Sequence, residues 1–288
     1  MRGFLLIDKA AGLSSFDVIR QLRKITGIKR IGHCGTLDPF ATGLLICALG
    51  SYTRLNSLLE ARKKSYEATL RLGQSTPTGD PESEVEETLS PNINRFDAQA
   101  ITDAALALTE LAIPKYSAVK IQGQRAYKLV RKGVEVEIPP RAVQVHSFRF
   151  LNPEELSEQN PYLSYVCTVS KGTYIRSLSV WIAAQMQTVA HTVSLRRTAI
   201  GDISVADAVK LDDLGDWQAA LVSCEMLFGH IPSQRLDEKQ ISTLKHGQSL
   251  PVEMADAEQV LALNNKGEIE TLGFVKDGNL RPKVNFRR

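Results

Sequence analysis

The spacing of hydrophobic and polar positions in the first part of the chain predicts strands, some as apolar runs and one as an alternating segment. The apolar run at residues 3–8 predicts a first strand, and Ser65–Leu72 alternates as a strand with one buried face does. Leu44–Leu49 is continuously apolar and ends at Gly50, which is typical of a buried strand or a short buried helix. These segments are the first candidates for the core of a sheet.

Capping residues predict a helix between the first two of these segments. Ser14 is followed three residues later by Asp17, the spacing of a capping box at a helix start. The helix is expected to run to about Ile25 and to stop at Gly27. The loop Lys9–Gly12 precedes it.

The middle of the chain mixes short helices with strands, and the strands mostly follow one another. This order favours an α+β fold over a doubly wound sheet. The predicted elements are a helix capped by Asp97 and running to about Ala112, a strand at Tyr116–Gln122, a helix near Arg125–Lys132, strands near Val134–Ile138, Val143–Leu151 and Leu163–Ser170, and a helix from about Ile175 to Gln187.

A boundary near residue 225 is expected to divide the chain into a larger domain (1–225) and a small β-rich domain (226–288). In the second part, short apolar runs are separated by Asn264–Gly267 and by Lys276–Asn279. Both separators have the composition of hairpin turns. A small sheet built from consecutive hairpins is therefore predicted there.

The composition is that of a globular protein, with 43% hydrophobic and 23% charged residues among 288. No window approaches the roughly 20 apolar residues that a membrane span needs, so no membrane association is expected. The four cysteines are scattered, without zinc-knuckle spacing or a dense disulfide framework. A reducing cytoplasm is the simplest expectation.

Positive charge is concentrated in particular segments, although the net charge is only +3. Residues 115–141 contain seven basic and two acidic residues, whereas acids gather at residues 80–87, which we interpret as a solvated run. Segregated basic patches suit a polyanion, above all a nucleic acid. An ordinary solvated surface is the alternative.

The loop Gly32–Gly43 places one carboxylate, Asp38, among glycines, hydroxyls and a proline. Pro39 disfavours helix at Asp38 and moves it to an extended or turn conformation. A loop held by rigid structure is the usual location of a catalytic group. A turn aspartate bonded to its own backbone is the alternative.

Several motifs occur in one order with this loop, and together they resemble the TruB-type tRNA pseudouridine synthases. The resemblance covers roughly residues 3–215, and residues 225–288 weakly resemble an RNA-binding domain of the PUA type. The motifs are Asp8-Lys9…Gly12…Ser14-Ser15, the Gly32–Gly43 loop, Lys64-Ser65-Tyr66, Tyr116-Ser117-Ala118 with Gly123…Tyr127…Arg131-Lys132-Gly133, Lys171–Arg176, and His191…Leu195-Arg196-Arg197.

The resemblance implies an isomerase that converts uridine-55 in the T-loop of tRNA to pseudouridine. It implies a catalytic domain with a mostly antiparallel mixed sheet flanked by helices, a thumb insertion at about 115–141, and a small PUA-like domain. It also implies that the T-arm of tRNA is the partner and that no cofactor or metal is used. Nothing in the sequence demands an oligomer or an obligate protein partner, so a monomer is expected.

The resemblance assigns Asp38 as the catalytic carboxylate and Arg176 as its ion-pair partner. A guanidinium nearby opposes the rise in pKa that burial imposes on a carboxyl group, and it fixes the orientation of that group. Without the motif Lys171–Arg176, the position of Arg176 would indicate a surface residue on the first turn of a helix.

Four further residues are assigned to substrate binding by the same resemblance. Tyr66 is implied to stack on the target base, and Tyr174 and Leu195 to line the uridine pocket; packing is the alternative for all three. His33 is implied to fill the space left by a flipped-out nucleotide, with a plain loop histidine as the alternative. Lys128, Arg131 and Lys132 of the thumb are implied to contact the RNA backbone.

Two positions depart from the family pattern. Ala10 stands where the family commonly has a proline, and Val180-Trp181-Ile182-Ala183 lacks the acid that usually follows the arginine. Two other function classes remain open: a protein that binds or remodels tRNA without chemistry, and a carboxylate-dependent hydrolase of the glycosidase type. The hydrolase normally needs two placed carboxylates.

Overall fold

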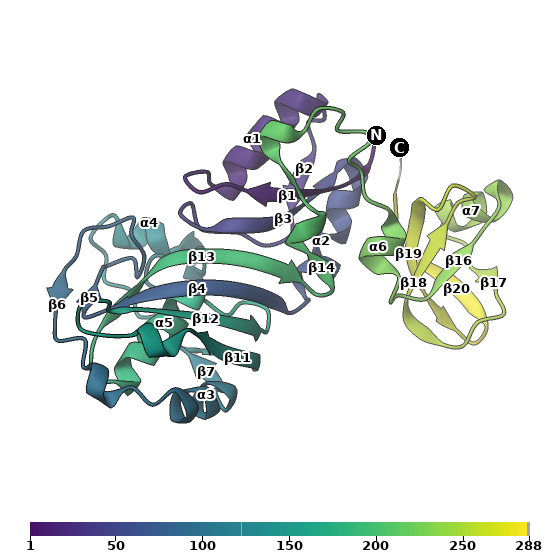
Figure 1. Cartoon of the computed structure of the whole chain (residues 1–288). Helices are drawn as coiled ribbons and strands as arrows, with labels where there is room; N and C mark the ends of the chain where they lie inside the picture. Colours follow the sequence, from purple (N-terminus) through teal and green to yellow (C-terminus); the bar gives the residue numbers. More distant parts are fainter. Residues whose placement is uncertain (122, 287–288) are drawn as a thin grey trace.

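The computed structural model describes residues 1–121 and 123–286 of the chain. Its centre is a nine-stranded mixed sheet (Figure 1). Neighbouring strands are antiparallel, except that β13–β3 and β1–β15 are parallel. The order is β11 (Val145–Leu151), β12 (Tyr162–Val169), β4 (Lys64–Leu72), β13 (Ala190–Ile200), β3 (Thr42–Leu49), β1 (Gly3–Lys9) and β15 (Val209–Lys210), with β14 (Ile203–Ser204) beside β13 and β2 (Ile31–His33) beside β3. The predicted α+β class is confirmed.

Strands β1 and β3 are buried on both faces. Leu5 and Ile7 pack with helix α1 (Ser15–Thr26) on one face, whereas Phe4 and Leu6 pack with Tyr52 on the other. A strand covered on both sides has no polar face, which explains the continuous apolar run of β3. On the second face lie the short helices η1 (Gly50–Leu55) and α2 (Asn56–Glu60).

Helix α1 begins and ends as predicted. The Ser14 hydroxyl accepts a hydrogen bond from the Asp17 amide, and the Asp17 carboxylate accepts one from the Ser14 amide. Gly27 adopts a left-handed conformation with φ of 70° and closes the helix.

The other half of the sheet packs against helices α3 (Ala98–Leu106) and α5 (Ile175–Gln185). Helix α3 ends at Leu106 rather than at the predicted Ala112. The backbone after it bonds instead to the chain that follows the insertion, as β7 (Glu110–Leu111) with β10 (Arg141–Ala142). Those interstrand bonds end the helix. Short elements complete this half: β5 (Gln74–Ser75), β6 (Glu87–Thr88), η2 (Ile93–Arg95) and η3 (Pro153–Glu155).

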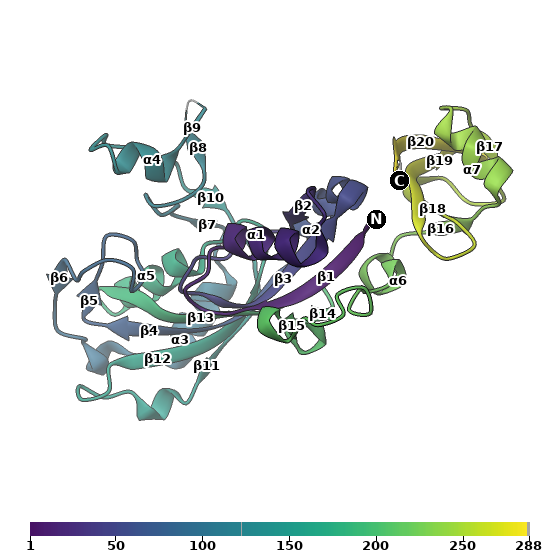
Figure 2. The same cartoon turned by 90° about the horizontal axis from the view of Figure 1, so that it is seen from above.

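The insertion between β7 and β10 stands away from the sheet (Figure 2). The strand predicted at Tyr116–Gln122 is limited to β8 (Lys120–Ile121), paired with β9 (Gln124–Arg125), and Gln122 lies outside the described residues. The predicted helix is the single turn α4 (Ala126–Val130), and Val134–Ile138 is not a strand. Such a segment has few neighbouring strands to bond to, so its β pattern is not realised.

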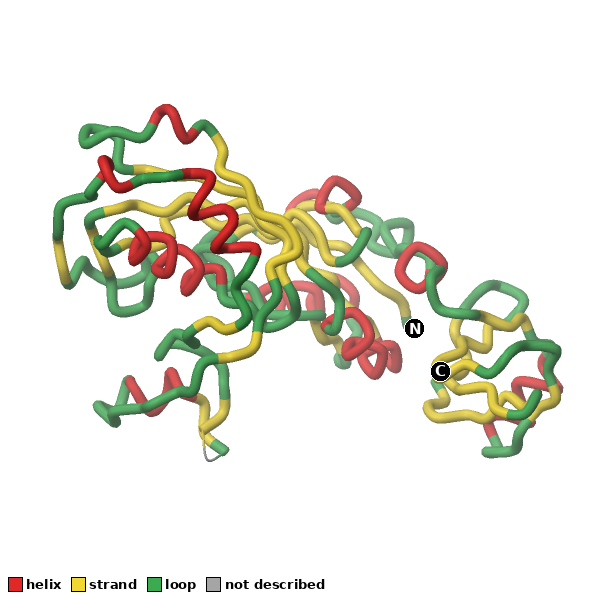
Figure 3. Tube along the Cα trace, turned by 90° about the horizontal axis from the view of Figure 1, so that it is seen from below, coloured by secondary structure: helices red, strands yellow, loops and turns green. Residues whose placement is uncertain are grey.

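The C-terminal region is β-rich, as predicted (Figure 3). Asp277 and Gly278 both have positive φ in the turn before β20, as a two-residue type I′ hairpin requires. The predicted 226–288 domain includes residues 287 and 288, which lie outside the described part. Two short helices precede this region, η4 (Val205–Asp207) and η5 (Leu211–Asp213). The region itself contains α6 (Cys224–Phe228), α7 (Glu238–Lys245) and a sheet of β16 (Ser233–Arg235), β18 (Ala257–Leu263), β19 (Ile269–Lys276), β20 (Asn279–Asn285) and β17 (Leu250–Pro251).

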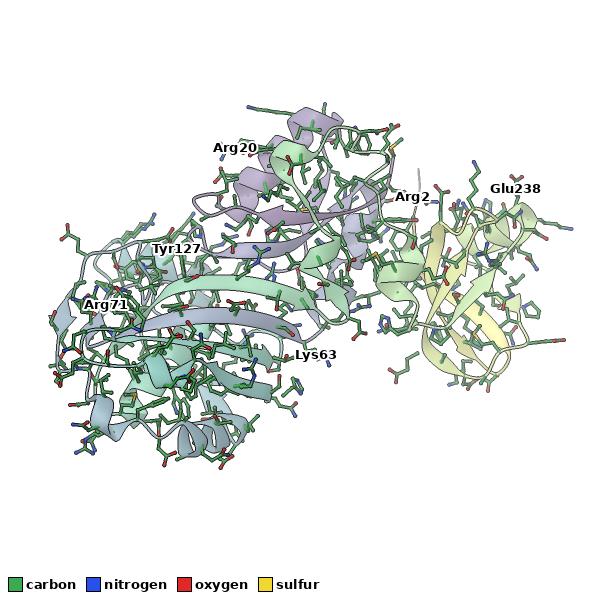
Figure 4. All side chains as sticks on the ribbon, in the orientation of Figure 1. Arg2, Arg20, Lys63, Arg71, Tyr127 and Glu238 are labelled. Atoms are coloured by element: carbon green, nitrogen blue, oxygen red, sulfur yellow. The ribbon has the colours of Figure 1, made fainter. Side chains whose placement is uncertain are left out.

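Tyr52 and Arg2 join the C-terminal sheet to the main one. The Tyr52 hydroxyl accepts a hydrogen bond from the Ile269 amide at 2.7 Å, and Arg2 forms an ion pair with Glu270. Figure 4 shows Arg2 at this junction. No helix in residues 1–121 or 123–286 is long and apolar enough to span a membrane.

Candidate active site

Asp38 lies in the loop between β2 and β3, and hydrogen bonds from Gly12 and Ser15 hold this loop in place. The Ser15 hydroxyl donates to the Leu37 carbonyl at 3.1 Å and accepts from the Leu37 amide at 2.9 Å. The Gly12 amide donates to the Pro39 carbonyl at 2.9 Å. The loop is thereby held on both sides of Asp38.

Two buried cations, Lys9 and Arg197, donate hydrogen bonds to backbone carbonyls of this loop and of the segments beside it. Lys9 is 1% exposed, and its ammonium group donates to the carbonyls of Ala10, Leu13 and Pro39 at 3.0, 2.6 and 3.1 Å. Burial lowers the pKa of Lys9 to about 8. An ammonium group bonded to three carbonyls acts here as a structural clamp.

Arg197 is the second cation, also 1% exposed. Its guanidinium donates to the carbonyls of Leu44, Thr36 and Gly35 at 2.7, 3.3 and 3.1 Å. Gly43 lies opposite Arg197 in the parallel β13–β3 pair, and a Cβ at this glycine would be 2.3 Å from the Arg197 carbonyl oxygen. Only glycine allows that close approach.

Arg176 reaches Asp38 from the first turn of α5. Its Nε lies 3.0 Å from Asp38 Oδ2, and its Nη2 donates to Asp38 Oδ1 at 3.3 Å. The guanidinium also donates to the carbonyls of Thr78 and Tyr116 at 2.6 and 3.2 Å. Arg176 is 4% exposed, so it is not the surface residue of the alternative interpretation.

Asp80 is a second carboxylate at this site, which the sequence analysis missed. Its Oδ2 lies 3.1 Å from Arg176 Nη1, and its side chain is 3% exposed. Its Oδ1 accepts from the Thr78 hydroxyl at 2.5 Å and from the Glu82 amide at 3.0 Å. The interpretation of residues 80–87 as a solvated run is therefore wrong for Asp80, although the glutamates there are exposed.

Asp80 thus meets Arg176 from the loop at residues 78–82. The signal that could have revealed it is the turn sequence Thr78-Gly79-Asp80-Pro81 at the start of the acidic run. Gly79 there has φ of 71°, which turns the chain and brings Asp80 back toward Thr76.

Burial raises the pKa of Asp38 above its usual value. Arg176 opposes this rise, and Asp80 adds to it. The site therefore holds two carboxylates around one guanidinium, with Asp80 and Arg176 buried and the Asp38 side chain 31% exposed.

Tyr66 and Leu195 lie on adjacent strands, β4 and β13, in the apolar cluster that also contains Leu37 and Ala41 from the Asp38 loop. They are 8% and 6% exposed. Tyr174 is the N-cap residue of α5, two positions before Arg176, and is partly buried. The fold thus brings Tyr66 and Leu195 into one apolar cluster with the Asp38 loop.

His33 ends β2 five residues before Asp38, and its ring is partly buried. Burial and Arg197 lower its pKa, which favours the neutral ring. No partner among the described residues bonds its Nδ1. No three His, Cys, Asp or Glu side chains of the described chain form a metal-binding group.

The thumb residues Lys128, Arg131 and Lys132 are exposed on and after α4. The Arg131 guanidinium lies 5.7 Å from the centroid of the Tyr127 ring. The base of the insertion reaches the site directly, because the Tyr116 carbonyl bonds to Arg176.

Comparison with known proteins identifies relatives along the whole chain. The model of the TruB family pseudouridylate synthase, N-terminal domain, matches residues 23–175. The tRNA pseudouridine synthase B of Leifsonia xyli is 38% identical over 292 residues, covering 99% of this chain and 96% of the relative. That of Thermobifida fusca is 37% identical and covers 99% and 98%.

Solved structures share the fold at lower identity. A Cbf5-Nop10-Gar1 complex contains a chain with a TM-score of 0.69 and 21% identity, covering 99% of this chain and 85% of the other. An H/ACA RNP bound to a substrate RNA with 2'-deoxyuridine gives 0.68, with the same identity and coverage. At this identity the match supports the fold alone.

Proposed function

This chain belongs to the TruB family of pseudouridylate synthases, which are isomerases, and from that premise we propose that it converts uridine-55 in the T-loop of tRNA to pseudouridine. The curated relatives are named for action on tRNA. In the net reaction the N1–C1′ bond breaks, a C5–C1′ bond forms, and the proton on C5 is replaced by one on N1. Atoms and electrons balance without a cofactor or co-reactant.

Asp38 is the catalytic carboxylate of this proposal. It acts on ribose C1′, on the base, or on a sugar proton, and each route requires the ionised carboxylate. Arg176 favours that form by its charge: its Nη2 donates to Oδ1 at 3.3 Å, and its Nε lies 3.0 Å from Oδ2. This pair is the single observation that carries the proposal.

The apolar residues beside Asp38 form the base pocket. Tyr66 offers an aromatic face for stacking, an interaction worth roughly 1–3 kcal/mol per base. Leu195 and Tyr174 complete the lining. An apolar surrounding excludes water from the sugar while the bond to the base is broken, which disfavours hydrolysis.

The target base must leave its loop to reach this pocket, at a cost of a few kcal/mol. We assign His33 to the space that the base vacates, and the exposed thumb cations to the phosphates on either side. Residues 1–225 form the catalytic domain, with the thumb at 115–141, and residues 226–288 form an RNA-binding domain of the PUA type.

An unmodified T-arm hairpin tests the proposal. Carbodiimide labelling of the RNA should detect pseudouridine after incubation with the wild-type protein and none with Asp38→Asn, while hairpin affinity stays within about tenfold. Full activity in Asp38→Asn would overturn the assignment.

The same assay separates the competing functions. Binding without product would indicate a clamp for tRNA. The second carboxylate, Asp80, gives a hydrolase its required pair, and release of free uracil would identify that reaction.

A further inference from the structure

The candidate active site is assembled from two groups of strands in the main sheet. Asp38 belongs to the first group, β1, β2 and β3, because its loop joins β2 to β3. Tyr66 and Leu195 lie in the second group, β4, β11, β12 and β13, and Arg176 lies on α5, which packs against that group. Figure 1 shows β1 and β3 on one side and β13, β4, β12 and β11 on the other. The distance between Asp38 and Arg176 therefore depends on how the two groups are joined.

The strands that join the two groups, β13 and β3, pair over a short stretch. In the described chain their parallel register consists of Arg196 with Thr42 and Arg197 with Gly43. By contrast, β13 pairs with β4 along its whole length, and β3 pairs with β1 along nearly all of its own. A ladder this short has few backbone hydrogen bonds, so its register depends more on the side chains that span it.

Asp8 and Arg196 form a side-chain connection across this pair of strands. Arg196 Nη1 donates to Asp8 Oδ1 at 3.0 Å, and Nη2 donates to Oδ2 at 2.7 Å. Nη1 also donates to the Thr42 hydroxyl at 3.3 Å, so one guanidinium joins β13, β3 and β1. A bidentate pair of this kind fixes direction as well as distance.

Each of the three connected residues directly precedes a residue beneath the Asp38 loop. The neighbours are Asp8-Lys9, Thr42-Gly43 and Arg196-Arg197. Successive side chains of a strand point to opposite faces, so the ion pair lies on the face opposite to Lys9 and Arg197. Those two cations donate to loop carbonyls on both sides of Asp38. The ion pair thus keeps in register the same strand positions that support the loop.

We propose that Asp8 and Arg196 are positioning residues of the reaction: their ion pair fixes β1 and β3 against β13 and thereby holds Asp38 at its distance from Arg176. The inference rests on the proposed function, because it concerns the same carboxylate. The Arg196 and Asp8 side chains are 37% and 17% exposed, and ion pairs that water reaches add little to stability. The effect of the pair is therefore on geometry and rate more than on unfolding.

Asp8→Asn and Arg196→Gln test the pair, separately and together. Asp8→Asn keeps the shape of the side chain, and thermal unfolding of each variant checks that the fold is kept. The matched control is Glu67→Gln. Glu67 is exposed on β4 and lies directly opposite Arg196. The control therefore removes a carboxylate beside the same guanidinium, but within the second group of strands.

The first measurement is the pKa of Asp38 in the RNA-free protein, by NMR titration of its carboxyl carbon, which Asp38→Asn assigns. Arg176 lowers this pKa, so a wider spacing between the two groups should let it rise. Asp8→Asn and Arg196→Gln should each raise it, and Glu67→Gln should not. For Asp8→Asn the direct effect of charge has the opposite sign, because removal of a negative charge lowers the pKa of a nearby acid. A rise in that variant therefore reports geometry.

The second measurement is single-turnover formation of pseudouridine in the T-arm hairpin. Each single variant should be about 10-fold to 100-fold slower than the wild type, the range expected for a catalytic group displaced by about 1 Å, with hairpin affinity within about threefold. The double variant should be no slower than the slower single variant, because both changes break one contact.

An Asp38 pKa that does not rise in either single variant, or a rate equal to that of the wild type, would overturn the proposal, whatever happens to the unfolding temperature. A double variant whose loss is the product of the two single losses would overturn it as well. Failure of the proposed function is read separately, as absence of pseudouridine with the wild-type protein, and the titration of Asp38 does not depend on that reaction.

Discussion

Asp80 and Arg176 form a buried ion pair, with 3.1 Å between Oδ2 and Nη1 and side-chain exposures of 3% and 5%. The same guanidinium meets Asp38. The buried Asp80 carboxylate thus holds Arg176 through Nη1. Nε and Nη2 of the same guanidinium lie next to Asp38, the proposed catalytic carboxylate.

We predict that Asp80→Asn slows the reaction more than it weakens RNA binding. The change removes the charge that anchors Arg176, and a misdirected catalytic group costs on the order of 10²-fold in rate. Loss of a hydrogen bond to a charged group should also lower the free energy of unfolding by about 1.5–3 kcal/mol. Single-turnover kinetics and urea unfolding measure the two effects. Glu84→Gln, on the exposed part of the same loop, should behave as wild type.

The pH dependence should show an acid limb set by Asp38. Burial raises the pKa of Asp38, Arg176 opposes the rise, and Asp80 adds to it. Because the reaction needs the ionised carboxylate, the rate should rise with pH through a midpoint above the ordinary aspartate value of about 3.9. In Asp80→Asn the midpoint should move to lower pH, since one cause of the rise is gone. A midpoint that stays in place would contradict the coupling of the two acids.

Gly43→Ala should disrupt the Asp38 loop. The added Cβ would lie 2.3 Å from the Arg197 carbonyl oxygen, at a residue whose φ is 103°. We expect a loss of unfolding free energy of about 3 kcal/mol or more, since both strain and overlap contribute. Gly27→Ala is the control: its φ is also positive, at 70°, but no atom lies within 4 Å of the new Cβ. It should cost only about 1–2 kcal/mol. Equal losses in the two variants would show that the close approach to Arg197 is unimportant.

Removing the positive charges of the thumb should weaken binding of the unmodified T-arm hairpin. The variant Lys128→Gln/Arg131→Gln/Lys132→Gln removes three exposed cations beside the site, and its salt slope should fall by about 2 to 3. Fluorescence anisotropy at several salt concentrations measures this. An unchanged slope would remove these residues from the RNA interface.

Several regular elements of both sheets followed from local patterns. The capping box at Ser14, the alternation of Ser65–Leu72 and the hairpin turn at Asp277-Gly278 each specify a structure through neighbours in sequence. The insertion did not follow, because its apparent strand at Val134–Ile138 has no neighbouring strand in the described chain to complete a ladder.

Asp38, Arg176 and Tyr66 could be nominated from motifs; in the structure Arg176 contacts Asp38, and Tyr66 lies in the apolar cluster that includes Leu37 and Ala41 of the Asp38 loop. Their catalytic roles stay predictions. Asp80 was not nominated: the turn Thr78-Gly79-Asp80-Pro81 marks it locally, but its burial depends on Arg176, which is 96 residues away. Charge composition alone made it look like the exposed glutamates that follow it.

The sequence by itself determined the α+β class, both ends of α1, the hairpin turn before β20 and the loop that carries Asp38, because these depend on residues within a few positions of one another. Only the tertiary structure decided which charges are buried together and which stay exposed. Ion pairing and desolvation act between side chains that meet in space, so the Asp38–Arg176–Asp80 arrangement and the hydrogen bonds of Arg197 follow only from the tertiary structure.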